Sequence, residues 1–174
     1  MARLLDVVWC LYFATHIPIT IFVDSQALFS STYYPDALVE LKTWYTREFK
    51  DCLMADPTAW FLSFVVCEML IQFPYILVAT YAFFKGPRAC PWIRIPNMIY
   101  SSHVITTLVA IGFHIMLHDA SQSKVPCPKT QKERLTLLAI YSPYFIIPLL
   151  MLLDGLFNSS AYLPLEGKGG KKRR

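Results

Sequence analysis

Charged residues and glycine are scarce in this chain of 174 residues. Asp, Glu, Lys and Arg together make up 16% of it, and glycine occurs six times. A water-soluble domain usually carries about 25% charged residues. Hydrophobic residues reach 55% and are concentrated in four blocks separated by polar connectors. The shortage of charge and the length of these blocks oppose a soluble helical bundle and predict a membrane protein.

Sequence motifs for metal and nucleic-acid binding are also absent. The five cysteines form no CxxC pair and no zinc-ligand spacing, so we expect no metal and no cofactor. No basic surface with interleaved aromatic residues is present, which excludes nucleic acid as a partner. Cys10 and Cys67 fall within apolar blocks. Cys52 and Cys127 lie in connectors on one side of the membrane, where a disulfide between them is an open alternative.

Each of the four apolar blocks is long enough to cross a hydrocarbon core about 30 Å thick. We predict an all-α polytopic membrane protein, a bundle of four transmembrane helices at about residues 4–23, 58–84, 97–117 and 135–157. Pro74, Pro143 and Pro148 remove backbone donors in two of these blocks, which predicts kinked helices around a cavity. The bundle forms one domain, residues 1–157, and residues 158–174 form a tail.

The connector from residue 24 to residue 58 has a helical pattern of its own. Apolar and aromatic residues recur in it at helical intervals, opposite charged residues, at Leu38, Leu41, Tyr45 and Phe49. This pattern predicts a short amphipathic helix. It either lies on the membrane surface or caps the bundle.

Polar residues at bilayer depth indicate a pocket inside the bundle. Glu68 and Gln72 lie one helical turn apart in the second block. A carboxylate at this depth costs roughly 2 to 4 kcal/mol or more, so such residues usually face a bundle interior or a cavity. His16 and Thr20 in the first block and Asp24 directly after it follow helical spacing, so one face of this helix becomes more polar towards its end.

Four spans place both termini on the same side of the membrane. That side collects the basic residues of the short loop 85–96 and of the tail, which favours it as the cytoplasmic side. The chain ends in KKRR, so Lys171 and Lys172 occupy the positions of a dilysine retrieval signal to the endoplasmic reticulum. The glycosylation sequon at Asn158 would then lie on the cytoplasmic side and stay unmodified.

Several blocks of the sequence resemble a known family. They are LYFATHIPIT (11–20) leading to Asp24, WYTREFKD (44–51), ADPTAWF (55–61), FPYILVATYAFFKG (73–86), WIRIPNMIYSSH (92–103) and ERLTLLAIYSPYFIIP (133–148). In this order, over roughly residues 8–157, they resemble the sigma-2 receptor family. That family comprises four-helix members of the EXPERA superfamily, which also includes the emopamil-binding sterol isomerase.

The resemblance implies a protein of the endoplasmic reticulum, with nuclear and endolysosomal membranes as further locations. It implies an occluded pocket that opens sideways to the bilayer and binds lipophilic cationic amines, sterols and oxysterols. It also implies that Asp24 pairs with the ligand ammonium and that Asp51 steadies it. The other residues expected to line the pocket are His16, Tyr45, Phe49, Phe64, Glu68, Gln72, Tyr100, Thr107, Tyr141 and Tyr144.

Plain structural alternatives stay open for several of these residues. Asp24 and Asp51 can be ordinary interfacial charges. His16 can be a packing residue, and Tyr100 and Tyr141 can be bundle packing alone. If the two aspartates are neighbours in the pocket, we expect them to share a proton and one of them to have a raised pKa, because like charges repel.

Receptor and enzyme remain competing functions at this point. A sterol isomerase protonates a double bond and removes a neighbouring proton, which needs an acid–base relay at fixed geometry. The isomerase carries a histidine one turn before its second-helix glutamate. Here Phe64 takes that place, and no other histidine falls on the same helix. We therefore predict a receptor without enzyme activity that regulates cholesterol homeostasis and trafficking, with a sterol isomerase as the alternative.

A regulatory partner protein without an essential ligand is the third alternative. The family is associated with the Niemann–Pick type C cholesterol transporter and the low-density-lipoprotein receptor. No sequence feature identifies an interface for either of them. A homodimer also fits the family, although no small-xxx-small face stands out.

Overall fold

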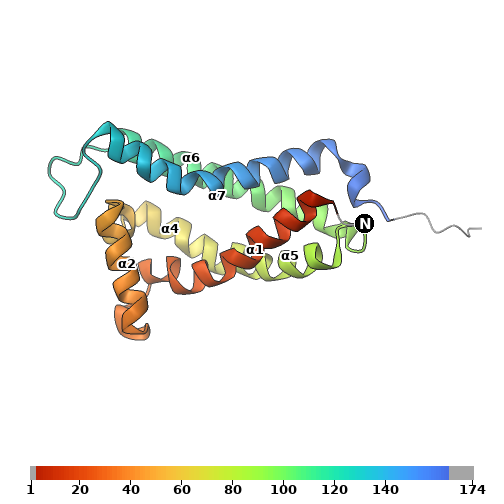
Figure 1. The fold of residues 1–174 in the computed structure, drawn as a ribbon, viewed down its shortest axis with the longest axis horizontal. Helices are drawn as coiled ribbons and strands as arrows, with labels where there is room; N and C mark the ends of the chain where they lie inside the picture. The colour runs from red at the N-terminus through yellow and green to blue at the C-terminus, as the bar shows by residue number, and fades with distance from the viewer. Residues whose placement is uncertain (1–2, 165–174) are drawn as a thin grey trace, which may run out of the picture.

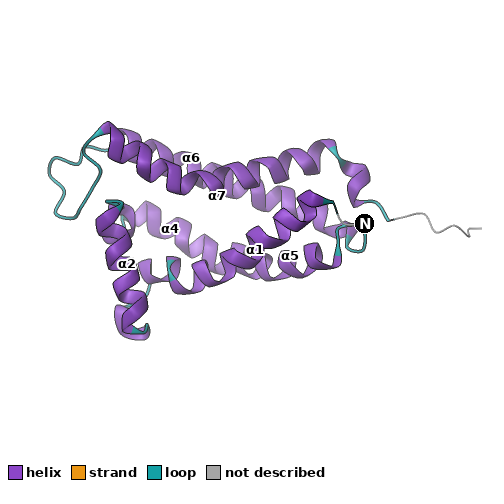
Figure 2. Ribbon diagram, viewed as in Figure 1, coloured by secondary structure: helices purple, strands orange, loops and turns teal. Residues whose placement is uncertain are grey.

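The computed structural model describes residues 3–164, and in this range the chain forms helices without any strand (Figure 2). Four helical stretches within it are long and apolar enough to cross a membrane: Leu4–Ala27, Ala59–Lys85, Pro91–Leu117 and Gln131–Phe157. They coincide with the four predicted blocks. The prediction of an all-α polytopic membrane protein is confirmed.

The spans are built from these elements. The first contains α1 (Leu4–Phe22) and a 3₁₀ turn (Asp24–Ala27). The second contains α4 (Ala59–Cys67), a π-helical turn (Glu68–Gln72) and α5 (Phe73–Lys85). The third contains a 3₁₀ turn (Pro91–Ile93) and α6 (Arg94–Leu117), and the fourth is α7 (Gln131–Phe157). The shorter elements are a 3₁₀ turn (Ser31–Tyr33), α2 (Asp36–Glu48), α3 (Cys52–Ala55) and a 3₁₀ turn (Ser159–Tyr162).

The spans pack as two pairs, α1 with α5 and α6 with α7 (Figure 1). The start of α1 and the end of α7 lie at one end of the bundle, as an even number of spans requires. The connection between α6 and α7 lies at the opposite end, together with α2 (Figure 1). Helix α2 is the predicted amphipathic helix. Lys42 Nζ ties it to the first span by donating to the Gln26 carbonyl oxygen at 2.8 Å.

Apolar side chains cover the outside of the spans as well as their interior. Large residues such as Leu70, Phe84 and Phe113 are between 65% and 80% exposed, which suits a surface in contact with lipid. Inside, one cluster of buried residues surrounds Trp9 and Phe13 in the half of the bundle near the termini. A second cluster, which includes Leu53, Phe61, Val65, Ile111 and Leu137, occupies the other half.

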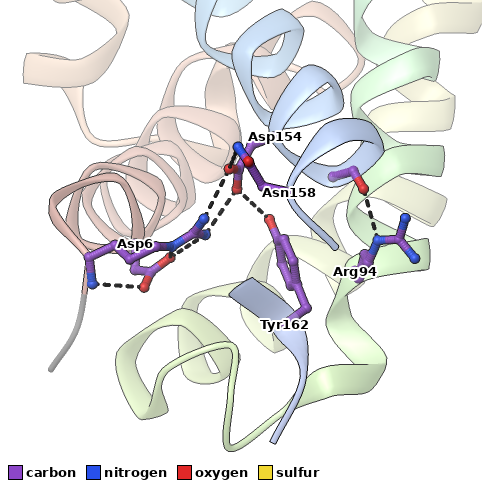
Figure 3. A network of polar contacts seen from close by, with 7 residues as sticks. Asp6, Arg94, Asp154, Asn158 and Tyr162 are labelled. Carbon is purple, nitrogen blue, oxygen red and sulfur yellow. Dashed lines mark hydrogen bonds and ion pairs between the residues drawn. The ribbon is translucent and has the colours of Figure 1, made fainter. Parts of the chain in front are cut away.

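A network of charged residues joins the two termini of the bundle (Figure 3). Arg3 donates to Asp6 at 2.7 Å and, through both terminal nitrogens, to Asp154 near the end of α7 at 2.9 and 3.0 Å. Tyr162 and Asn158 also donate to the Asp154 carboxylate, each at 2.9 Å. The buried Asp154 carboxylate therefore has a cation and two further donors, as a charge in this position requires.

The disulfide considered for Cys52 and Cys127 is not formed. All five cysteines, which all lie within the described range, are free. Burial and the neighbouring Cys127 thiol raise the pKa of Cys52 to about 12. The thiol is therefore protonated and unreactive at neutral pH. The predicted sorting residues Lys171 and Lys172 lie outside the described residues.

Candidate ligand-binding site

A cavity of about 240 Å³ opens between the first, second, third and fourth spans. Nine of the twelve predicted site residues line it: His16, Asp24, Tyr45, Phe64, Glu68, Gln72, Thr107, Tyr141 and Tyr144. Apolar side chains complete the wall, and sequence reasoning did not single these out: Ile19, Val23, Met54, Phe61, Val65, Val104, Leu108, Ile111 and Ile140. For eight of them the only signal was membership of an apolar block, which lipid-facing residues share, and Met54 lies in the connector between the first two blocks.

The π-helical turn carries both polar residues of the second span into the cavity. At its end the Phe73 amide donates to the Glu68 carbonyl oxygen, five residues back, instead of four as in an α-helix. Pro74 follows directly and has no N–H to continue the regular pattern. The sequence predicted a kink at Pro74, and the structure shows a widened turn just before it. Such turns are frequent at functional sites.

Glu68 has two side chains of α1 as neighbours. Thr20 Oγ1 donates to Glu68 Oε1 at 2.9 Å, and His16 Nε2 lies 3.4 Å from the same oxygen. Asp24 completes the group, because ligand atoms of His16, Asp24 and Glu68 all lie within 4.8 Å of one another. The polar stripe of the first block thus faces the carboxylate of the second block. Thr20 was part of that stripe but was not named as a site residue.

Asp51, which was named among the ligand-binding residues as the acid that steadies Asp24, does not line the cavity. Its side chain is fully buried, and its Oδ2 atom accepts from the Tyr141 hydroxyl at 2.7 Å and the Tyr45 hydroxyl at 3.0 Å. Its Oδ1 atom accepts from the Met54 amide at 3.2 Å and so caps the start of α3. Asp51 therefore acts on the cavity through the two tyrosines that it holds.

Burial raises the pKa of Asp51, and the hydrogen bonds from Tyr141, Met54 and Tyr45 oppose this shift. The expected raised pKa rested on repulsion and a shared proton between Asp24 and Asp51, whereas the shift at Asp51 comes from its burial. A shared proton between Asp24 and Asp51 was expected because both were placed in the pocket. The carboxyl group observed beside Asp24 is instead that of Glu68 in the second span.

Phe49 and Tyr100 also lie outside the cavity wall. The Phe49 ring packs against Tyr45, with ring centres 5.4 Å apart, and so supports a residue that does line it. Tyr100 is buried in the cluster around Phe13, with its hydroxyl 3.4 Å from that of Tyr12. For Tyr100 the bundle-packing alternative holds.

Comparisons with known proteins agree with this architecture. A profile of the EXPERA family, the expanded EBP superfamily, matches residues 37–155. The chain is 52% identical to sigma intracellular receptor 2 of Xenopus tropicalis over 157 residues, which is 90% of this chain and 91% of that one. It is 46% identical to sigma intracellular receptor 2 of Homo sapiens over 165 residues, 93% of this chain and 92% of that one.

The chain belongs to the sigma intracellular receptor 2 family of the EXPERA superfamily. A more distant similarity, 25% identity over 146 residues, connects it to efficient mitochondria targeting-associated protein 19 of Saccharomyces cerevisiae (79% of this chain and 89% of that one). The EXPERA match begins at residue 37, after α1, so it does not include His16 or Asp24. The alignment with the human receptor leaves only 7% of the chain uncovered, too little to omit these two residues from an end.

Proposed function

We propose that this EXPERA protein is an intracellular membrane receptor whose cavity binds lipophilic cationic amines and sterols. The observation that carries the proposal is the composition of the cavity. Asp24 and Glu68 face each other within it, and among the described residues of the wall none is Lys or Arg. An anionic site in an apolar cavity favours a positively charged guest with an apolar body, because close opposite charge offsets its lost hydration.

The aromatic wall supports the same guest. Tyr45, Phe64, Tyr141 and Tyr144 line the cavity, and aromatic faces attract a cation that has been removed from water. Their apolar rings also suit the rigid hydrocarbon body of a sterol, whose hydroxyl group the polar residues can bind. An apolar groove between α6 and α7 shares Leu108 and Tyr141 with the cavity. Because this groove adjoins the cavity, it supports entry of a ligand from the bilayer side.

Binding of a radiolabelled lipophilic amine to the purified full chain tests the proposal. We expect the Asp24→Asn variant to lose at least about 100-fold in affinity, because leaving one buried charge without its partner costs roughly 3 to 5 kcal/mol. Glu40 lies exposed on α2, so Glu40→Gln is a matched control that should bind like the wild type. Oxysterols should displace the amine. Unchanged affinity in the Asp24→Asn variant would contradict the proposal.

A sterol isomerase is the second candidate, and one contact favours it. The sequence offered Glu68 no relay partner on its own helix. In the structure His16 Nε2 lies 3.4 Å from Glu68 Oε1, so the absence of a histidine from the helix of Glu68 does not leave this carboxylate without a histidine neighbour. The partner comes from α1, which spacing within one helix could not show. A histidine beside a carboxylate can transfer protons between two positions of a bound sterol.

Expression in cells that lack sterol isomerase separates the two candidates. Restored migration of the sterol double bond, lost again in the His16→Gln and Glu68→Gln variants, would establish the enzyme. The relatives are named receptors, and on this basis we favour a receptor without such activity. Sterol analysis should then show no rescue by the wild-type chain.

The cellular role belongs to the same proposal. We assign the protein to the endoplasmic-reticulum membrane with both termini cytoplasmic, and to the control of cholesterol homeostasis and trafficking. The Niemann–Pick type C cholesterol transporter and the low-density-lipoprotein receptor are its proposed functional partners. If Asp24→Asn abolishes amine binding but leaves cholesterol trafficking unchanged, the cellular role does not depend on the cavity.

A further inference from the structure

We propose that His16, Asp24 and Glu68 form a binding site for a divalent transition-metal ion within the cavity. The inference that the ion and a cationic amine compete for this site rests on the proposed function, whereas metal binding itself does not. The sequence contains no zinc-ligand spacing, because the three residues come from two different spans. Only the packing of α1 against the second span brings them together.

The distances suit a small metal ion. Zinc is bound by imidazole nitrogen and carboxylate oxygen at about 2.0 to 2.2 Å, so two ligand atoms of a tetrahedral site lie roughly 3.3 to 3.6 Å apart. His16 Nε2 and Glu68 Oε1 are 3.4 Å apart. Asp24 supplies a third ligand atom within 4.8 Å of the other two. Metal binding would require the Asp24 side chain, at the start of a 3₁₀ turn, to move toward the other two ligand atoms.

The charge of the site also matches a divalent ion. A metal ion displaces protons from its ligands, so Asp24 and Glu68 would bind it as two carboxylates beside a neutral imidazole, a set with two negative charges that no Lys or Arg among the described residues of the wall offsets. An ammonium group neutralises one of these charges and leaves the other beside it. A divalent ion neutralises both, which removes the repulsion between Asp24 and Glu68.

The state of His16 is a separate observation that points to a ligand. The residue is only 7% exposed, and its Nδ1 atom has no hydrogen-bond partner among the described residues. Its other nitrogen faces Glu68 at a distance too long for a strong hydrogen bond. A metal ion bound at Nε2 would give this nitrogen a firm partner in place of the long contact to Glu68, and would keep the imidazole proton on Nδ1. Thr20, which donates to Glu68 at 2.9 Å, would orient that carboxylate from behind, as outer residues of metal sites do.

The expected ion belongs to the first transition row. One nitrogen and two oxygen ligands suit Zn²⁺, Co²⁺, Fe²⁺ and Mn²⁺ better than Ca²⁺, which prefers six to eight oxygen atoms. Zn²⁺ and Co²⁺ are the probes of choice, because Zn²⁺ is redox-inert and Co²⁺ absorbs visible light when bound in a tetrahedral site.

Titration of the purified full chain with Co²⁺ tests the site. We expect visible absorption that saturates at one ion per chain and disappears when Zn²⁺ is added. His16→Gln and Glu68→Gln should each weaken Co²⁺ binding by at least the roughly 10- to 100-fold typical of metal-site changes. Thermal unfolding of each variant shows that it is folded, and either of the two variants suffices for the test.

Two other groups of residues could bind the probe, and the design separates them from the cavity. His114 and His118 stack with ring centres 4.4 Å apart at the end of α6, so their double replacement by Gln is the matched control. It should leave Co²⁺ binding unchanged. Sulfur-to-cobalt charge-transfer absorption would reveal binding by cysteine. Loss of binding in the double variant, such charge-transfer absorption, or retained binding in both cavity variants would overturn the proposal.

Competition completes the experiment. Zn²⁺ should lower the affinity for a radiolabelled amine in proportion to its occupancy of the site. If the amine binds but Co²⁺ does not, the metal site is wrong and the proposed receptor function stands. If Co²⁺ binds but no amine does, the receptor function is wrong and the metal site stands. If both bind without competing, the shared site is wrong.

Discussion

At the scale of single residues, the buried carboxylate of Asp51 positions two tyrosines of the cavity wall. Its burial raises its pKa above the ordinary value of 3.8. The folded protein then holds the proton more tightly than the unfolded chain does. Protonation of Asp51 therefore stabilises the folded state relative to the unfolded chain. This stabilisation is fully present below about pH 3.8 and is lost as the pH rises through the folded-state pKa.

We predict that the Asp51→Asn variant lacks the part of the pH dependence of folding stability that comes from this carboxyl group. The melting temperature of the wild type should fall relative to that of the variant as the pH rises from about 4. Asparagine also caps helices well, so the start of α3 should persist in the variant. Thermal unfolding in detergent over a pH series measures the effect. The exposed Asp56→Asn variant is the control, and a constant difference between wild type and Asp51→Asn at every pH would contradict the prediction.

The sequence predicts that a residue faces the cavity when the residue is ionisable and lies deep in the bilayer. Glu68 lies in the middle of an apolar span, where an ionisable side chain without a polar environment is too costly, and it does face the cavity. The position of Asp51 depends instead on how a loop folds, and that is not encoded in a helical period. The contact between His16 and Glu68 depends on how two helices rotate against each other, which the sequence does not show either.

At the scale of elements, the π-helical turn orients the cavity face of the second span. The sequence predicted every span from its apolar length and predicted α2 from its amphipathic period. It also placed an irregularity at Pro74. It could not predict the kind of irregularity, because a kink and a widened turn both follow from one missing backbone donor.

We predict that Pro74→Ala makes the protein more stable but weakens ligand binding. The new amide can donate to the Leu70 carbonyl, and one added hydrogen bond is worth about 0.5 to 1.5 kcal/mol. The same bond favours a regular α-helix, which would turn Glu68 and Gln72 away from their present directions. Thermal unfolding and amine binding, measured on the same preparation, check both parts.

Pro87 lies in the loop after α5, so Pro87→Ala is a control for loss of a proline outside the turn. It should leave amine affinity unchanged. A Pro74→Ala variant with wild-type affinity would show that the turn does not depend on this proline.

At the scale of the whole molecule, Arg3 joins the first and last spans. It pairs with Asp154, whose side chain is 3% exposed, across 151 residues of sequence. We predict that Arg3→Ala lowers the free energy of unfolding by about 3 kcal/mol, because it leaves a buried carboxylate without its cation. The stability of the Arg3→Lys variant should fall between those of the wild type and Arg3→Ala, since lysine keeps the charge but not the paired hydrogen bonds.

Thermal and denaturant unfolding of the purified protein measure this effect. Arg88 is exposed in the loop at the same end of the bundle, and Arg88→Ala should leave stability unchanged. Equal stability of Arg3→Ala and wild type would mean that the network in Figure 3 does not stabilise the bundle.

The orientation of the molecule in the membrane follows from the common position of both chain ends. If the end that carries Arg3 and Asn158 is cytoplasmic, the end with α2 and the α6–α7 connection faces the lumen. We predict that Ser30→Asn, before Ser31 and Thr32, and Ser121→Asn, two residues before Ser123, create sequons that receive glycans. The wild-type sequon at Asn158 should receive none. A shift in gel mobility that is reversed by a glycosidase measures the modification, and a glycan on the wild-type chain at Asn158 would invert the orientation.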